Sequence, residues 1–259
     1  MREHYWQYRI IQDNLEFYAL APYSTYKPEF EDYSQDAKAA SKWGGGHVDF
    51  WTKYLIATIY FSGLYKRIDY VTCYPSHSEG SGNPIMDEPM LLFTKCFRKT
   101  YLRDMILRHT QSVKSSYART SGIAIDHLNQ LQTINLRRDP LRGSGAKRFA
   151  ASPLKAGKTI LVVDDIFTRG YSLEAARQFV SQTNANIICL SWLKTINSDY
   201  EIINDSYSFN PYTPTEFEAP DVTSYPYKDG VVDPLAPKEV KDKLTAYDSW
   251  VWPDDVESS

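Results

Sequence analysis

The segment ILVVDDIFTRGYS, residues 160–172, decides how this chain of 259 residues is expected to fold. It begins with four aliphatic residues, which are typical of a strand buried in a parallel sheet. Two carboxylates, Asp164 and Asp165, follow where that strand should end, and a polar turn then leads into a helical pattern over residues 171–182. Residues 185–193 supply the next strand, so the segment predicts a strand-helix-strand unit.

The turn in this segment has the chemistry of a phosphate-binding loop. Ligands bind beyond the carboxyl ends of parallel strands, and backbone N–H groups at the start of a helix cradle phosphate. Ionised Asp164 and Asp165 only accept hydrogen bonds, so they suit the hydroxyls of a ribose. We therefore expect a site for a ribose that carries a 5-phosphate. The phosphate loop would comprise Thr168, Arg169, Gly170, Tyr171 and Ser172.

The segment resembles the motif with which type I phosphoribosyltransferases bind phosphoribosyl pyrophosphate (PRPP), although Arg169 stands where Thr is commoner. The resemblance implies an α/β fold with an open, mostly parallel sheet and helices on both faces. It implies that Asp164 and Asp165 are catalytic residues of a transferase, in which a nitrogen acceptor, usually a nucleobase, displaces pyrophosphate. It also implies Mg²⁺ bound through PRPP, with Asp164 as a candidate direct ligand.

Two other segments stand where that family contacts pyrophosphate. Residues 69–74 predict a strand, and the loop after it begins with Pro75, Ser76 and His77. The basic loop 137–149 corresponds to a mobile loop that closes over the reaction and excludes water. Its candidate pyrophosphate contacts are Arg142, Lys147 and Arg148. A plain connection and a solvated charged loop are the alternative interpretations of these two segments.

The closer resemblance is to the ComF-like branch of the family, over residues 69–194. The three cysteines do not form the zinc module that precedes the core in that branch, so a role tied to the module does not carry over. In purine-salvage members a lysine after the next strand contacts the base, and Lys194 takes that place. Those members have an Asp where this chain has Thr168. The positions that match the sequence pattern of the ComF-like branch are Pro75, Arg108, Thr110, Gln111, Arg119 and Phe149.

The sequence divides into three regions. Residues 1–65 form a variable N-terminal hood, which is Tyr-rich and expected to be irregular before a helix at 48–64. Residues 66–196 form the phosphoribosyltransferase-like core, and residues 197–259 form an acidic, aromatic and Pro-rich extension that is irregular. Further helices are expected at residues 88–107 and 112–131 in the core, and a short helix is expected at 237–247 in the extension.

Charge and cysteine content limit the class of protein. Residues 95–158 hold 14 Lys and Arg against three acids, a net +11, whereas residues 196–259 hold four Lys against 14 acids, a net -10.

Three scattered cysteines indicate a reducing compartment. The sequence begins without an apolar signal core, and its longest apolar run, 54–65, is too short to span a bilayer. We expect a cytoplasmic protein without a membrane partner, and a homodimer is common in the family.

Two alternatives to an enzyme stay open on this sequence. The same pocket would serve a sensor that holds PRPP or a nucleotide and regulates a partner without turnover. A third interpretation is an effector of an antiphage system, since retron-associated effectors include phosphoribosyltransferase-like proteins. In that case the basic segment 95–158 would meet nucleic acid or a partner that carries it, with an affinity that falls as salt rises.

Overall fold

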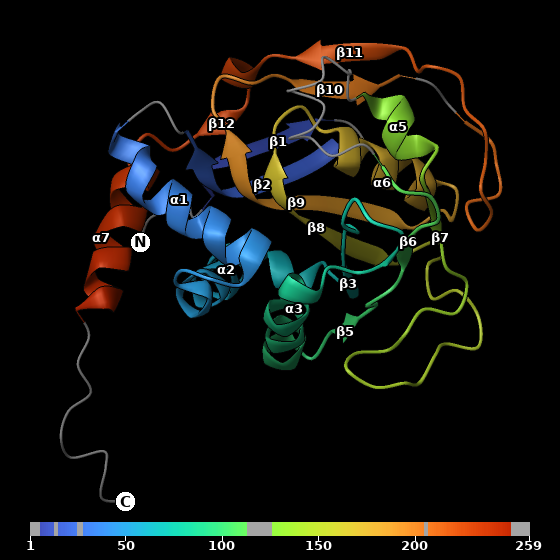
Figure 1. Cartoon of the computed structure of the whole chain (residues 1–259), viewed down its shortest axis with the longest axis horizontal. Helices are drawn as coiled ribbons and strands as arrows, with labels where there is room; N and C mark the ends of the chain where they lie inside the picture. The colour runs from blue at the N-terminus through green and yellow to red at the C-terminus, as the bar shows by residue number, and fades with distance from the viewer. Residues whose placement is uncertain (1–5, 13–14, 25–27, 113–125, 205–206, 250–259) are drawn as a thin grey trace, which may run out of the picture.

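The computed structural model describes residues 6–12, 15–24, 28–112, 126–204 and 207–249, and it has an α/β architecture (Figure 1). A seven-stranded sheet has the order β12-β1-β2-β9-β8-β3-β5. The five strands from β2 to β5 in this order run parallel, and β1 and β12 pair antiparallel at one edge. The strands are β12 (Val231–Val232), β1 (Tyr8–Gln12), β2 (Leu15–Tyr23), β9 (Asn186–Thr195), β8 (Thr159–Phe167), β3 (Tyr70–Cys73) and β5 (Thr100–Tyr101).

Helices cover both faces of this sheet, so the expected α/β fold class with a mostly parallel sheet is confirmed at this level. One apolar core holds α1, α2, α3 and α7 against the sheet. These helices are α1 (Pro28–Trp43), α2 (Val48–Phe61), α3 (Pro84–Phe97) and α7 (Ala236–Asp248). A second core on the other face holds α5 and α6. These are α5 (His127–Leu131) and α6 (Tyr171–Ser181).

Smaller strands lie over the second face. β4, β6 and β7 form a three-stranded antiparallel sheet, and β10 pairs antiparallel with β11. Their bounds are β4 (Gly80–Ser81), β6 (Ile106–Arg108), β7 (Ile134–Leu136), β10 (Tyr200–Ile203) and β11 (Val222–Tyr225). Two single turns of 3₁₀-helix lie at Leu64–Lys66 and Tyr227–Asp229.

The central strand β8 is buried on both of its sides. Leu161 and Val163 point into the first core, and Ile160 and Val162 point into the second. This alternation follows from the pleat, which sends successive side chains to opposite faces. A continuous apolar run is therefore what this strand needs, and polar residues are confined to its end.

The chain reverses its winding direction between β3 and β8, which are neighbours in the sheet. From β3 it passes through α3 on the first face to β5, and from β8 it passes through α6 on the second face to β9. Such a switch point leaves a crevice at the carboxyl ends of the two strands, where open α/β sheets bind ligands. Cys73 pairs with Val163, so the loop after β3 begins beside Asp164.

Several expected elements are present near their expected bounds. The strand at 69–74 is β3, and the helices at 48–64, 171–182 and 237–247 are α2, α6 and α7. The strand at 159–164 is β8, which continues through Phe167. Of the helix expected at 112–131, α5 covers the end, and residues 113–125 lie outside the described part of the chain.

Other expectations were wrong. The Tyr-rich N-terminal stretch is not irregular: it contributes β1, β2 and α1, and β2 joins the parallel part of the sheet beside β9. Pro22 does not break β2 because it lies near the end of the strand, where a missing N–H is tolerated. The helix expected at 88–107 ends at Phe97 because Arg98 takes a left-handed conformation with φ of 54°, and β5 and β6 follow. The acidic tail also contains β11 and β12.

Within the described residues, no helix is both long enough and apolar enough to cross a bilayer.

A buried carboxylate joins α6 to β10. Glu174 is fully buried, and it receives two hydrogen bonds from β10, from the Tyr200 hydroxyl at 2.7 Å and the Ile203 N–H at 3.0 Å. Arg177 forms an ion pair with the same carboxylate and also donates to the Ile203 carbonyl. The helix that follows the phosphate loop is therefore fixed to β10 by charge as well as by apolar packing.

We predict that Glu174→Gln destabilises the protein by about 3 kcal/mol, because it leaves the buried Arg177 charge without a partner. Urea unfolding followed by circular dichroism measures the change. Asp242→Asn serves as the matched control, since Asp242 pairs with Lys238 on an exposed helix face and such pairs contribute little. Equal stability of the two variants would contradict the role assigned to Glu174.

Candidate functional site

The acidic pair lies at the end of β8, in the crevice beside β3. The Asp165 N–H donates to the Asp164 carboxylate at 2.9 Å, and the Ile166 N–H donates to Asp165. On the α1 side, the Lys42 ammonium lies 2.9 Å from the second oxygen of Asp165. The two carboxylates are thus partly held by the backbone that follows them, and one of them already has a cationic partner.

The electrostatic environment of Asp164 and Asp165 favours the binding of a cation. Burial, and next the charge of Asp165, raise the pKa of Asp164 to about 7, although the hydrogen bond from the Asp165 N–H, the charge of Lys42 and a Ser172 hydrogen bond oppose the shift. Burial acts to lower the pKa of Lys42, but the charge and hydrogen bond of Asp165 and the charge of Asp164 together outweigh it, and the pKa is raised. Two adjacent carboxylates with a single neighbouring lysine suit a ligand that brings hydroxyl donors and a cation.

The phosphate loop makes a tight turn from β8 into α6. Gly170 has φ of +102°, and a Cβ at this position would lie 2.9 Å from the Phe167 ring and 3.2 Å from the Tyr200 ring. The turn brings Thr168 beside Thr195, with 3.0 Å between the hydroxyl oxygens, and it brings Ser172 to Asp164. The structure therefore places Thr168, Gly170 and Ser172 around the first turn of α6, as the motif predicts.

The other two loop residues have partners on β10 and α5. Arg169 forms an ion pair with Glu201, and its carbonyl accepts from the Glu201 N–H at 2.9 Å. The Tyr171 ring packs edge-on against the buried ring of His127 at 4.6 Å between centroids. Burial lowers the pKa of His127, which lies 3.5 Å from Glu201. Arg169 and Tyr171 thus tie the loop to its surroundings, and their side chains turn away from the acidic pair.

Lys194 supports the loop from below. Its side chain is buried, and its ammonium donates to the carbonyls of Thr168, Thr195 and Ser198 at 2.8, 3.1 and 2.5 Å. An ammonium has three N–H donors, so none is left for a base in this conformation. In this structure Lys194 points inward under the loop, where burial lowers its pKa to about 7. The base contact expected from the sequence is not made in this arrangement and stays a prediction.

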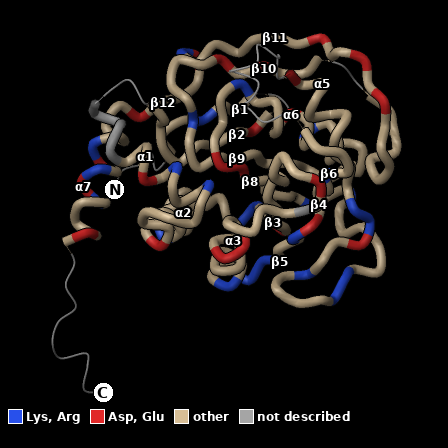
Figure 2. The backbone as a smooth tube through the Cα atoms, in the orientation of Figure 1, with Lys and Arg blue, Asp and Glu red and all other residues tan. Residues whose placement is uncertain are grey.

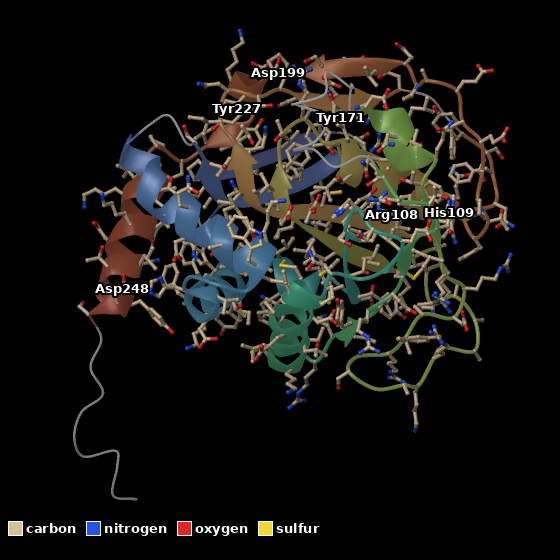
Figure 3. All side chains as sticks on the ribbon, in the orientation of Figure 1. Arg108, His109, Tyr171, Asp199, Tyr227 and Asp248 are labelled. Carbon is tan, nitrogen blue, oxygen red and sulfur yellow. The ribbon has the colours of Figure 1, made fainter. Side chains whose placement is uncertain are left out.

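The loop after β3 is held by Arg108, a buried side chain that Figure 3 labels. Arg108 donates to the Ser76 carbonyl, and the Ser112 N–H donates to the His77 carbonyl at 2.9 Å. In a trans peptide the C=O and N–H point in opposite directions. The N–H group of His77 therefore points away from Arg108, and that of Ser78 points away from Ser112. Arg108 and Ser112 thus fix the backbone of the β3 loop, which begins beside Asp164 at the switch point.

The basic loop 137–149 does not reach the acidic pair in this structure. Arg148 donates to the buried Asp104 carboxylate at 2.9 Å, where Arg137 also binds. Arg142 lies over the Phe149 ring, and that ring contacts Tyr70 at the first residue of β3. The loop packs by the amino end of β3 and the edge strand β5, so Arg142, Lys147 and Arg148 do not approach the acidic pair here, and their expected contact with a pyrophosphate stays a prediction.

Two residues at the site carry roles that the sequence did not assign. Lys42 lies in a helix within a region that looked irregular, so its approach to Asp165 had no sequence signal except the helical spacing of its own stretch. Arg108 belongs to the ComF-like sequence pattern, but its role in holding the β3 loop depends on the pairing of β6 with β7. Both depend on contacts between residues distant in sequence.

The residues present fit a magnesium ion that arrives with its ligand. Among the described residues, no group of three or more His, Cys, Asp or Glu side chains gathers to hold a metal. Two adjacent carboxylates alone are a poor cage, but Mg²⁺ prefers one or two carboxylates together with substrate oxygens and water. Asp164 and Asp165 would hold such an ion together with the ligand.

Comparison with known proteins gives no family assignment. No family model matches the chain, and no curated protein matches its sequence. The likeness to phosphoribosyltransferases therefore depends on residues 160–172 and on the contacts described above.

We predict that Gly170→Ala destabilises the protein and disrupts the phosphate loop, because the new Cβ meets Phe167 and Tyr200 in a backbone region that L residues rarely adopt. Thermal unfolding measures the loss of stability. Gly157→Ala is the matched control: Gly157 also has a positive φ, but a Cβ at that position would meet nothing within 4 Å. A loss no larger than that of the control would show that the close packing under Gly170 is unimportant.

The raised pKa of Asp164 predicts a pH dependence of stability. Between about pH 4 and pH 7 the folded state holds a proton that the unfolded state has released, so this group makes the protein less stable as pH rises through that window. We expect Asp164→Asn to stabilise the protein at pH 8 and to have a smaller effect at pH 5. Unfolding in urea at both values measures this difference, and a gain of equal size at the two values would contradict it.

Proposed function

We propose that this protein binds PRPP with Mg²⁺ and transfers the phosphoribosyl group to a nitrogen acceptor, best a nucleobase, with release of pyrophosphate. The observation that carries the proposal is the position of the acidic pair and the phosphate loop. Both lie within residues 164–172, where β8 extends past β3 and turns into α6, at the switch point beside the β3 loop. This arrangement supports a ligand with a 5-phosphate, a ribose and a second anionic group.

Each part of the site has a task in that reaction. The N–H groups around Gly170 and the hydroxyls of Thr168 and Ser172 hold the 5-phosphate. Asp164 and Asp165 accept hydrogen bonds from the ribose hydroxyls and hold Mg²⁺, which neutralises the pyrophosphate when bound. The bond from C1 to the pyrophosphate oxygen breaks, its electron pair leaves with pyrophosphate, and the acceptor nitrogen forms the new bond and loses its proton.

The carboxylates also favour the transition state. Positive charge develops on the ribose as the leaving group departs, and two fixed carboxylates near C2 and C3 are oriented before this charge appears. Fixing the ribose between the phosphate loop and the β3 loop holds C1 in line with its acceptor. Positioning and electrostatics therefore supply the catalysis, and no side chain has to form a covalent intermediate.

We predict that the purified protein releases pyrophosphate from PRPP in the presence of Mg²⁺ and one member of a nucleobase panel. The double variant Asp164→Asn, Asp165→Asn should lose more than about 99% of the rate, because several kcal/mol of electrostatic stabilisation are removed. A coupled pyrophosphate assay measures turnover, and calorimetry measures PRPP binding. Lys238→Gln, on exposed α7, is a control that should leave the rate unchanged.

The outcomes separate the proposal from a sensor. Binding of PRPP without release of pyrophosphate across the whole panel would contradict the transferase and favour a regulatory binding protein. Absence of PRPP binding by the unmodified protein would contradict both.

A nucleic-acid partner is a second candidate, favoured by the Lys and Arg positions at the end of α3 and along loop 137–149 (Figure 2). Several of the basic residues are neutralised within the protein: Arg137 and Arg148 pair with Asp104, and Lys158 pairs with Asp69. Among the described residues of segment 95–158, the exposed remainder consists of Lys95, Arg98, Arg138, Arg142, Lys147 and Lys155. Co-purified nucleic acid that is lost at high salt would favour an effector that binds such a partner.

A further inference from the structure

Helix α1 brings a lysine to the acidic pair from outside the motif. Ala37, Ala40 and Ser41 are buried and fix the helix against the first face of the sheet. Lys42 follows directly and extends to the end of β8, where its ammonium lies 2.9 Å from Asp165. Its side chain keeps 38% of its surface exposed, so the ammonium is accessible from solvent beside the acidic pair.

Three other basic side chains expected near the ligand have partners elsewhere in the protein. Arg148 pairs with Asp104, Arg142 lies over Phe149, and the ammonium of Lys194 is saturated by three carbonyls under the loop. Arg108 is committed to the Ser76 carbonyl and to two side chains on the α5 side. Within the described parts of the chain, Lys42 is the cationic side chain that contacts the acidic pair.

The position of Lys42 also relates it to the β3 loop. Asp165 meets α1, which belongs to the same face of the sheet as α3. The loop that begins at Pro75 first passes through β4 over the second face, and it returns to the first face at α3. The start of α3 lies beside the end of α1, since a Cβ at Gly44 would be 3.8 Å from the Ile85 side chain. A ligand whose ribose contacts Asp165 and whose second anionic group faces the part of this loop that leads into α3 would therefore have this group near Lys42.

We propose that Lys42 binds the pyrophosphate group of PRPP, and that in the free protein it serves as the counterion of Asp165. This inference rests on the proposed function. It assigns the cationic contact with pyrophosphate to α1 and not to loop 137–149. When the ligand binds, the ribose hydroxyls and Mg²⁺ would contact Asp165 in place of Lys42. The Lys42 ammonium would then bind the pyrophosphate oxygens. Lys42 would then be a substrate-binding residue that the phosphoribosyltransferase motif does not contain.

Calorimetric titrations with Mg²⁺ and three ligands test this: PRPP, inorganic pyrophosphate and ribose 5-phosphate. We expect Lys42→Met to weaken the binding of PRPP and of pyrophosphate by about tenfold or more, which is the usual effect of losing one charged hydrogen bond. The affinity for ribose 5-phosphate should change by less than about twofold, and Lys42→Arg should restore part of the affinity for pyrophosphate. The matched control is Lys38→Met, one turn earlier on α1, where the ammonium lies 3.3 Å from the Tyr23 hydroxyl.

Three results would overturn the inference. Unchanged affinity of Lys42→Met for all three ligands would make Lys42 a plain surface ion pair. Equal losses for ribose 5-phosphate and PRPP would mean that it acts only through Asp165. Binding of ribose 5-phosphate, but not of pyrophosphate or PRPP, by the unmodified protein would contradict the inference. The assignment of the ribose 5-phosphate site would still hold in that case. If the unmodified protein binds none of the three, the proposed function itself fails. Circular dichroism and an unfolding midpoint establish that each variant is folded.

Discussion

A strand that is buried on both faces can carry charge only where its surroundings open. This constraint acts on β8, whose residues from Ile160 to Val163 alternate between two apolar cores. The next two residues are acidic, and they lie where β8 extends past its last residue pair with β3 but still pairs with β9. The sheet topology makes this edge a switch point, where open α/β sheets bind ligands, so the burial of β8 places the acidic pair and the start of the phosphate loop there.

The apolar burial around β8 also sets the electrostatic character of the site. It withdraws water from Asp164 and, together with the charge of Asp165, raises the pKa of Asp164 to about 7. Lys42 offsets part of this repulsion in the free protein, and Lys194 fixes the loop above it without reaching the ligand side. The site therefore keeps an unsatisfied preference for positive charge and for hydroxyl donors, which matches a magnesium-bound sugar phosphate.

Local sequence patterns were enough to predict β8, α6 and β9 and the order of acids, phosphate loop and helix. They were sufficient because each element carries its own signal: an apolar run, a glycine at a positive φ and a helical period. The roles of Lys194 and of loop 137–149 could not be predicted in this way. Lys194 follows a strand in the expected place, but whether its ammonium points up to a base or down to carbonyls depends on packing against β1 and β8.

The N-terminal region shows the same limit on a larger scale. Its tyrosines and prolines suggested a loose hood, yet Phe17 and Ala19 of β2 are fully buried and pair with β9, because the parallel sheet needs a further strand at that side. Only then does α1 have a surface on which to pack, and only then does Lys42 approach Asp165. The part of the site that adds most to the motif thus comes from tertiary structure and not from a local pattern.

The most direct test of the central claim is a crystal structure of the protein soaked with PRPP and Mg²⁺. The account predicts the 5-phosphate at the first turn of α6 around Gly170, the ribose hydroxyls on Asp164 and Asp165, and the pyrophosphate between the β3 loop and α1. A ligand bound elsewhere, or one whose 5-phosphate lies away from the start of α6, would contradict it.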